Sequence, residues 1–510
     1  MPRYAAIDIG SNSIRMEAAE VAPEKPMRIL ASDREVTRLG ESVFRTGSVS
    51  EEALKATCAV LERMAERYRK LEVAGVRAVA TSAIRDARNQ SGFVERTSEA
   101  AGTAVEIISG GEEARLIHLG VESNWPQGGK RILIFDIGGG SAEIIAARRG
   151  HMEEAFSMPL GAIRLRESFL KTDPAPPLQL HQMREYIQEK LAIAVRRLGH
   201  DGWERAIATS ATAAAVARAV SRVRRAKRDE IDRRRASSAQ VRQLYRKLAE
   251  RDLAGRRKVT GIGPRRAEII VPGVAVLLEL LNEFRLPAVY YSRAGVRDGV
   301  IADLAARNVE AQLTRLSRDE RHDVEEMSRK YYVQPEHARK VAEIVSLLFI
   351  GLEPLHKMPH ASGRLLEAAA YLLDVGHFIS RANHHKHSYY VVSNSDMPGF
   401  TERERMLIAC LCRYHRKSLP LPTHGPYQAL TTEDRRVLMM LIPLLRLADN
   451  LIRSYGSPIR GVECQLRDGE VALQVQSNND IDLERWGTER IAAVFRQVYE
   501  RDLVVTRAKE

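Results

Sequence analysis

Two short loops carry the residue types that could do chemistry in this chain of 510 residues. Residues 8–13 read Asp-Ile-Gly-Ser-Asn-Ser, and residues 136–143 read Asp-Ile-Gly-Gly-Gly-Ser-Ala-Glu, each after an apolar run. Glycines let the backbone bend and bring its N–H groups close to an anion, and hydroxyl and amide side chains add donors. We therefore expect both loops to bind phosphate; a hairpin turn rich in turn formers is the alternative for the first loop.

Carboxylates flank the second loop, because Asp136 precedes the three glycines and Glu143 follows them. Oxygen ligands beside a phosphate cradle suit Mg²⁺, and Mn²⁺ is not excluded. The sequence therefore predicts a divalent-metal site here. The alternative is a flexible turn with a solvated glutamate.

Two further segments place polar groups at the start of a helix. Thr209 and Ser210 follow a short apolar strand, and their hydroxyls can cap a helix or bind phosphate; the residues alone favour capping. Arg85 ends the segment Thr-Ser-Ala-Ile-Arg and is able to pair with a phosphate, or to lie on the surface.

The elements that must position these loops occur twice. The apolar strand and turn at residues 5–10 return at residues 131–138, and strand-then-helix patterns follow each copy. This internal duplication predicts two α/β lobes. Helical periodicity replaces strands after about residue 305, and a hairpin, a helix and a strand are expected after residue 459. The domains expected are 1–125, 126–305, 306–458 and 459–510.

The composition limits the class of protein. Four cysteines exclude a disulfide scaffold, and Cys410 and Cys412 are interpreted as plain thiols because no second pair completes a zinc set. The longest apolar stretches are shorter than the roughly 20 residues that span a bilayer, so a soluble cytoplasmic protein is expected. The net charge of +13 favours a polyanionic partner. Residues 218–251 hold 13 Lys and Arg against four Asp and Glu, which is either a solvated helix face or a surface for a polyanion.

The sequence resembles the exopolyphosphatase/guanosine pentaphosphate phosphohydrolase (Ppx/GppA) family of the sugar kinase/actin/Hsp70 superfamily. The matching segments run in the family's order: 5–15, 80–85, 107–117, 135–143, 270–277 and 294–299, with 384–388, 394–400 and 413–417 further on. The resemblance implies an α/β fold of two duplicated actin-like (ribonuclease H-like) lobes, an all-α HD-like domain and a small α+β tail. It also implies hydrolysis of a terminal phosphoanhydride and a homodimer.

The resemblance assigns roles residue by residue. Glu113 is the expected catalytic base, and Asp136, Glu143 and, more weakly, Asp8 are the expected Mg²⁺ ligands. A group that orients or deprotonates the attacking water is what phosphoryl transfer to water needs. Glu112 is expected only to favour the helix dipole. The expected phosphate-binding residues are Ser11, Asn12, Ser13, Arg15, Arg85, Gly138, Gly139, Gly140, Ser141, Thr209 and Ser210. Relatives often carry glycine where Ala211 stands, so altered phosphate contacts are expected there.

The helical half resembles the HD-type phosphohydrolase fold, whose metal set needs a histidine, a His-Asp pair and a distal aspartate. His337 and Asp449 stand at suitable ends, but the central pair reads Leu373-Asp374, so one ligand is missing. Other histidines crowd nearby, namely His377, His384, His385, His387 and His415. A substrate-binding or dimerising role is favoured over a metal site.

Three functions are compatible with these residues. The first is an exopolyphosphatase that releases orthophosphate from inorganic polyphosphate. The second is a guanosine pentaphosphate 5′-phosphohydrolase of the stringent response, which would use the same cleft and the same glutamate. The third is a catalytically weak sensor of polyphosphate or an alarmone. No membrane and no specific nucleic acid are expected as partners. Full length and the basic surplus favour polyphosphate.

Overall fold

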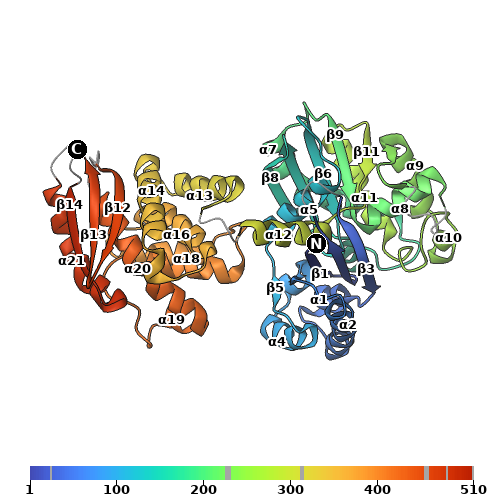
Figure 1. Cartoon of the computed structure of the whole chain (residues 1–510). Helices are drawn as coiled ribbons and strands as arrows, with labels where there is room; N and C mark the ends of the chain where they lie inside the picture. Colours follow the sequence, from blue (N-terminus) through green and yellow to red (C-terminus); the bar gives the residue numbers. More distant parts are fainter. Residues whose placement is uncertain (23–25, 224–230, 311–314, 453–458, 478–480, 508–510) are drawn as a thin grey trace. The chain divides into compact units, whose positions relative to one another are not determined.

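The computed structural model describes residues 1–22, 26–223, 231–310, 315–452, 459–477 and 481–507 (Figure 1). The chain divides into two compact units, Met1–Ala306 and Arg307–Glu510. Each unit is described by itself below.

The first unit begins with a five-stranded sheet in the order β3-β2-β1-β4-β5 (Figure 1). Its first three strands form an antiparallel meander, and β4 then pairs with β1 in parallel. The strands are β1 (Arg3–Ile9), β2 (Ile14–Glu20), β3 (Arg28–Glu35), β4 (Gly75–Ala80) and β5 (Val105–Ile107). The helices are α1 (Leu39–Thr46), α2 (Glu51–Arg69), α3 (Ser82–Asp86) and α4 (Gln90–Ala101).

A second sheet in the same unit repeats this plan, in the order β10-β11-β9-β6-β7-β8. Strands β6 to β8 form an antiparallel meander, and β9 pairs with β6 in parallel as β4 does with β1. The duplication predicted from the sequence is thereby confirmed. The strands are β6 (Arg131–Ile137), β7 (Ala142–Arg148), β8 (His151–Met158), β9 (Arg205–Thr209), β10 (Arg235–Ser237) and β11 (Ala288–Tyr291). The helices are α6 (Ala162–Phe169), α7 (Pro177–Leu198), α8 (Ser210–Ser221), α9 (Ser238–Ala249), α10 (Leu253–Arg257) and α11 (Ile270–Glu283).

Helix α5 (Gly110–Asn124) packs against both sheets. Its Leu116 belongs to an apolar cluster with residues of β1 and β4, while Ile117 belongs to a cluster with residues of β6 and β7. Helix α12 (Val296–Glu310) crosses α5 at very short range, since a Cβ on Gly299 would lie 1.8 Å from the carbonyl oxygen of Leu116. Glycine is required at this crossing, and the crossing fixes the position of α5.

The long apolar stretch near residue 270 forms α11, a helix buried in the second lobe. Its Glu279 is fully buried and accepts hydrogen bonds from Arg184 Nε at 2.6 Å and Gln188 Nε2 at 3.0 Å. Those bonds offset the burial of its charge. None of the helices that the structure describes combines the length and apolar composition needed to cross a bilayer.

The second unit packs helices around one apolar core and ends in a three-stranded sheet, β12-β13-β14. The hairpin expected after residue 459 forms, and β14 then pairs with β13 in parallel. Cys410 and Cys412 are buried free thiols in this core. The helices are α13 (Arg318–Lys330), α14 (Pro335–Gly351), α15 (Glu353–His356), α16 (His360–Leu372), the 3₁₀ helix η2 (Val375–Phe378), α17 (His384–Ser393), α18 (Glu402–Tyr414), α19 (Gly425–Gln428), α20 (Thr432–Leu451) and α21 (Asp482–Tyr499), and the strands are β12 (Ile459–Arg467), β13 (Glu470–Ser477) and β14 (Asp502–Arg507).

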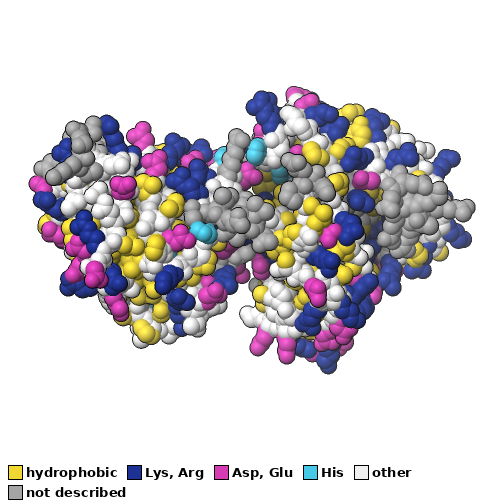
Figure 2. Space-filling model, viewed as in Figure 1, with side chains coloured by type: hydrophobic (Ala, Val, Ile, Leu, Met, Phe, Trp, Pro, Cys, Tyr) yellow, Lys and Arg dark blue, Asp and Glu magenta, His cyan; other side chains and the backbone are white. Residues whose placement is uncertain are grey.

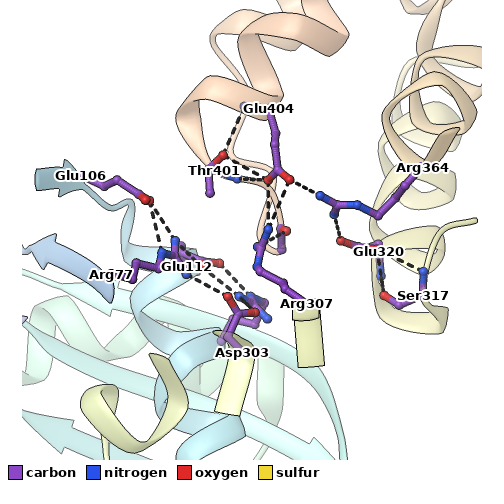
Figure 3. A network of polar contacts seen from close by, with 12 residues as sticks. Arg77, Glu106, Glu112, Asp303, Arg307, Ser317, Glu320, Arg364, Thr401 and Glu404 are labelled. Carbon is purple, nitrogen blue, oxygen red and sulfur yellow. Dashed lines mark hydrogen bonds and ion pairs between the residues drawn. The ribbon is translucent and has the colours of Figure 1, made fainter. Parts of the chain in front are cut away.

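Two helix starts in the second unit are joined by one arginine. Glu320 completes a capping box at the start of α13, and Glu404 completes one at the start of α18. The guanidinium of Arg364 forms an ion pair with both carboxylates, as Figure 3 shows. Arg307 also pairs with Glu404, at 3.2 Å. The two caps and the buried arginine therefore hold α13, α16 and α18 together.

Candidate active site

The structure brings the two predicted phosphate loops side by side. A Cβ on Gly140 would lie 2.6 Å from Ser11 Oγ and 2.5 Å from Ser82 Oγ, and one on Gly139 would lie 3.3 Å from the backbone nitrogen of Asn12. Any side chain at these glycines would push the loops apart. The glycines are therefore explained by the close approach of two loops that lie 128 residues apart in the sequence.

Both loops are tight turns of the same form. Gly10 N–H donates to Ser13 O at 3.2 Å, and Gly138 N–H donates to Ser141 O at 3.0 Å. Each turn joins two antiparallel strands, so the hairpin geometry and the polar loop occur together. Ser11, Ser13 and Ser141 are buried and Asn12 is half-buried.

Three of the predicted polar residues meet at the ends of β1, β6 and β9. Asp136 lies opposite Thr209 in the strand register, and Thr209 Oγ1 donates to Asp136 Oδ2 at 2.5 Å. Asp8 lies opposite Arg15 on the paired strands β1 and β2.

The capping role favoured for Thr209 is wrong, because its hydroxyl is directed to Asp136 and makes no cap to α8. Ser210 likewise donates to the carbonyl oxygen of Ile137, at 2.9 Å.

Glu113 lies in the first turn of α5, after the N-cap Ser109. Its side chain is buried, and both terminal nitrogens of Arg85 lie 3.4 Å from Oε2. Arg85 is fixed in turn by a 2.6 Å hydrogen bond from Nη1 to Ile108 O. Arg85, expected to bind phosphate, therefore contacts the expected base in this structure.

The carboxylates of the site influence one another's protonation. Burial raises the pKa of Asp136 to about 6, against the opposing effects of the Thr209 hydroxyl and Arg15. Burial and the charge of Asp136 raise the pKa of Glu143, which accepts a 2.9 Å hydrogen bond from Ser157, to about 7. Burial and then Glu143 raise the pKa of Glu113 well above its usual value. Burial also raises the pKa of Asp8. Grouped buried carboxylates that resist losing protons form a hard oxygen set, which fits Mg²⁺.

Glu112 lies next to Glu113 but in a different environment. Figure 3 shows its carboxylate in a buried network with Arg77, Glu106 and Asp303, in which Arg77 Nη2 lies 3.1 Å from Glu112 Oε1. Arg115 Nε donates to Glu112 Oε2 at 2.7 Å. Burial alone would raise the pKa of Glu112, but Arg115 and Arg77 outweigh it and hold the pKa below its usual value. The dipole role expected for Glu112 is thus incomplete, because the residue belongs to an ion-pair network.

Arginines that the sequence reasoning missed face the same site. Burial and the positive charges of Arg15 and Arg218 lower the pKa of Arg266 to about 10. Burial and the charge of Arg297 lower the pKa of Arg15, while Asp8 and Asp136 oppose this. A bound anion would reduce the repulsion between these positive charges. Arg297 stands inside the matching segment 294–299, which was the available signal for it, whereas Arg266 stands just before the segment 270–277 and outside it.

The model of the Ppx/GppA phosphatase family matches residues 17–308, and the model of Ppx/GppA phosphatase domain III matches residues 320–486. The chain belongs to the Ppx/GppA phosphatase family. Membership in this phosphatase family makes the chain a hydrolase.

Three solved structures each match 60% of this Ppx/GppA phosphatase. The family member from Aquifex aeolicus is 27% identical with a TM-score of 0.54, and the match covers 60% of this chain and 98% of that one. An exopolyphosphatase-like protein is 27% identical with a TM-score of 0.57, covering 60% and 99%. The exopolyphosphatase from Cytophaga hutchinsonii is 23% identical with a TM-score of 0.56, covering 60% and 98%, and it bears on the fold alone.

Proposed function

We propose that this Ppx/GppA phosphatase is an exopolyphosphatase, which hydrolyses the terminal phosphoanhydride of inorganic polyphosphate and releases orthophosphate with Mg²⁺. One observation carries the proposal: the buried carboxylates Asp136, Glu143 and Glu113 share a site with mutually repelling arginines. Carboxylates alone would repel a polyphosphate chain, and arginines alone would bind it without reaction. Together they suit a metal-bound phosphate chain next to a base.

In this proposal Glu113 accepts a proton from the attacking water. The water oxygen forms a bond to the terminal phosphorus while the P–O bond to the next phosphate breaks, leaving orthophosphate and a chain shortened by one unit. A carboxylate with a raised pKa is matched to this proton transfer near neutral pH. Arg85 holds the carboxylate in place through the contacts at 3.4 Å.

The loops and the arginines would position the chain. The backbone N–H groups and hydroxyls of residues 11–13 and 139–141 offer donors to phosphate oxygens from two adjacent turns. Asp136, Glu143 and Asp8 would hold Mg²⁺, which would neutralise phosphate charge. Arg266 and Arg15 would contact phosphates further from the reacting one.

A basic face on the second lobe favours a polymer over a nucleotide. Helix α9 buries Val241, Leu244 and Leu248 and exposes its basic residues on the other side, namely Arg242, Arg246 and Lys247. Figure 2 shows dark blue side chains on the part of the first unit that carries α9. A long chain of phosphates is able to use such a face without specific geometry, and its binding should weaken with salt.

The test compares orthophosphate release from long-chain polyphosphate and from guanosine pentaphosphate by the purified chain with Mg²⁺. A kcat/KM at least tenfold higher for the polymer is expected. The reverse preference would replace the proposal by an alarmone phosphatase. Release from neither substrate by folded protein would favour a sensor.

A paired substitution tests the basic face. R246A/K247A should raise KM for long-chain polyphosphate and leave kcat and the KM for a short polyphosphate unchanged. The control is R196A, which removes an exposed positive charge from α7 of the same lobe. An equal rise in KM in the control would mean that net charge, and not this face, attracts the polymer.

A further inference from the structure

In the second unit, three histidines surround the carboxylate of Asp374. His384 Nε2 lies 3.5 Å from Asp374 Oδ1, and His377 Nε2 lies 3.8 Å from the same oxygen. His337 Nε2 lies 3.8 Å from Oδ2. All three distances exceed the roughly 2.7–3.2 Å of an N–H···O hydrogen bond. The three nitrogens therefore face the carboxylate at more than hydrogen-bond distance, and the Nε2 of His384 also lies 3.2 Å from the Nε2 of His415.

These separations are close to those of ligands that share one metal ion. Two ligands of a tetrahedral zinc ion, each bound at about 2.1 Å, lie about 3.4 Å apart. The ligand atoms of Asp374, His377 and His384 all lie within 4.8 Å of one another. A contraction of a few tenths of an ångström would bring the closest of them into coordination.

The backbone holds these side chains together. Ser388 Oγ on α17 accepts a 2.9 Å hydrogen bond from Gly376 N and donates to Leu373 O at 2.6 Å. A Cβ on Gly376 would lie 2.1 Å from the carbonyl oxygen of His384, so η2 and the start of α17 pack as closely as two backbones allow. The backbone contacts between η2 and α17 therefore fix the positions of the residues that carry the cluster.

The charges around the cluster are mixed. Arg416 Nη1 lies 3.1 Å from Nδ1 of His384 and 3.4 Å from its Nε2 and opposes a cation, while Asp449 adds negative charge beside Asp374. The side chain of His384 is 6% exposed and that of His377 is 44% exposed, so the cluster opens to solvent at His377.

We propose that Asp374, His377 and His384, with His337 as a fourth ligand, bind a first-row divalent transition metal such as Zn²⁺. Imidazole nitrogens favour such ions over Mg²⁺, which prefers oxygen. Leu373 stands where the HD-type metal set has a histidine, and His377 and His384 would supply imidazoles in its place. This inference is independent of the proposed polyphosphate activity, because the cluster and the phosphate loops belong to different units.

The test measures Zn²⁺ binding to the full chain by calorimetry, after chelator treatment and with excess Mg²⁺ present. Wild-type protein is expected to bind one equivalent of Zn²⁺ that D374N does not bind, and H377A should bind it at least tenfold more weakly. The matched control is H387A, which removes a histidine from the same helix outside the cluster. Co²⁺ in place of Zn²⁺ should give visible absorption bands of a nitrogen-ligated ion in the wild type and in H387A only.

The outcomes decide the proposal. Equal affinity and stoichiometry in the wild type, D374N and H377A would overturn it, and so would the same loss in H387A. If circular dichroism shows that D374N is unfolded, H377A decides, because the exposure of its side chain makes that substitution tolerable.

Discussion

Glu112 and Glu113 are consecutive residues of helix α5, and their carboxylates lie in opposite electrostatic surroundings. Glu112 contacts Arg77 and Arg115, which hold its pKa below the usual value. Glu113 lies near Glu143, and burial with that negative charge raises its pKa well above the usual value. One helix start thus provides a fixed anion for structure and, in the proposed mechanism, a proton acceptor for chemistry.

Replacing Glu113 by glutamine should abolish turnover without loss of stability. The amide cannot accept the proton of water, so kcat for orthophosphate release is expected to fall about 10³-fold. Because E113Q removes one charge from a group of repelling carboxylates, the free energy of unfolding should stay equal or rise. Phosphate-release kinetics and thermal unfolding of the same preparation check both statements. Retained turnover would refute the assignment of the base.

Replacing Glu112 by glutamine should act in the reverse way. E112Q leaves Arg77 and Arg115 with one carboxylate fewer in a buried network, and breaking a buried ion pair from one side costs about 3–5 kcal/mol. A lower melting temperature is expected for E112Q, whereas the folded molecules should retain turnover. An unchanged melting temperature would mean that Asp303 and Glu106 compensate for the lost charge.

The sequence predicted the fold where local signals and long-range packing agree. Asp-Ile-Gly after an apolar strand marks both β1 and β6, and the repeat at residues 8 and 136 was enough to predict two lobes. The sequence did not reveal that α5 packs on both sheets. That packing depends on the close approach of Gly299 to the carbonyl group of Leu116, and these residues are 183 positions apart. Such a glycine has no local signature that separates it from a turn former.

The candidate site was predicted as a set of loops and not as a network. Glycines at 139 and 140 pointed to a close approach, and the structure shows what approaches, namely Ser11 and Ser82. The segment around Thr209 favours capping when taken alone, and the resemblance adds a phosphate-binding role; the contact of Thr209 with Asp136 comes from strand pairing that a single segment does not reveal. Arg266 was missed because its neighbours in space, Arg15 and Arg218, are remote in sequence.

Activity should fall on the acid side of neutral pH, and we call this part of the pH–activity curve the acid limb. Asp136 has a pKa of about 6 and Glu143 of about 7, so both are protonated at pH 5 and activity should rise as pH increases through 6 to 7. Mg²⁺ competes with protons for these oxygens, so more Mg²⁺ should move the limb to lower pH. Without Mg²⁺ the native state binds more protons than the unfolded chain, and the free energy of unfolding should fall as pH rises from about 4 to 7.

Thr209→Val provides a direct check of that limb. The hydroxyl stabilises the charged form of Asp136, so its loss should raise the pKa of Asp136 above about 6 and move the acid limb to higher pH. More Mg²⁺ should be needed for half-maximal rate at pH 7. The measurement is a pH profile of kcat/KM at two Mg²⁺ concentrations. An identical profile in T209V would show that Asp136 does not control the limb.

Gly140→Ala should separate the two phosphate loops. The new methyl group would lie 2.5 Å from Ser82 Oγ and 2.6 Å from Ser11 Oγ, distances at which the neighbours must move. We expect kcat/KM to fall at least tenfold and the free energy of unfolding to fall by about 1–3 kcal/mol, as overpacking usually causes. Gly129→Ala is the matched control, because nothing lies within 4 Å of its Cβ position, and it should leave both quantities unchanged. If G140A retains full activity while its stability falls, the close packing of the loops serves the fold alone, and the phosphate-binding role of the second loop is refuted.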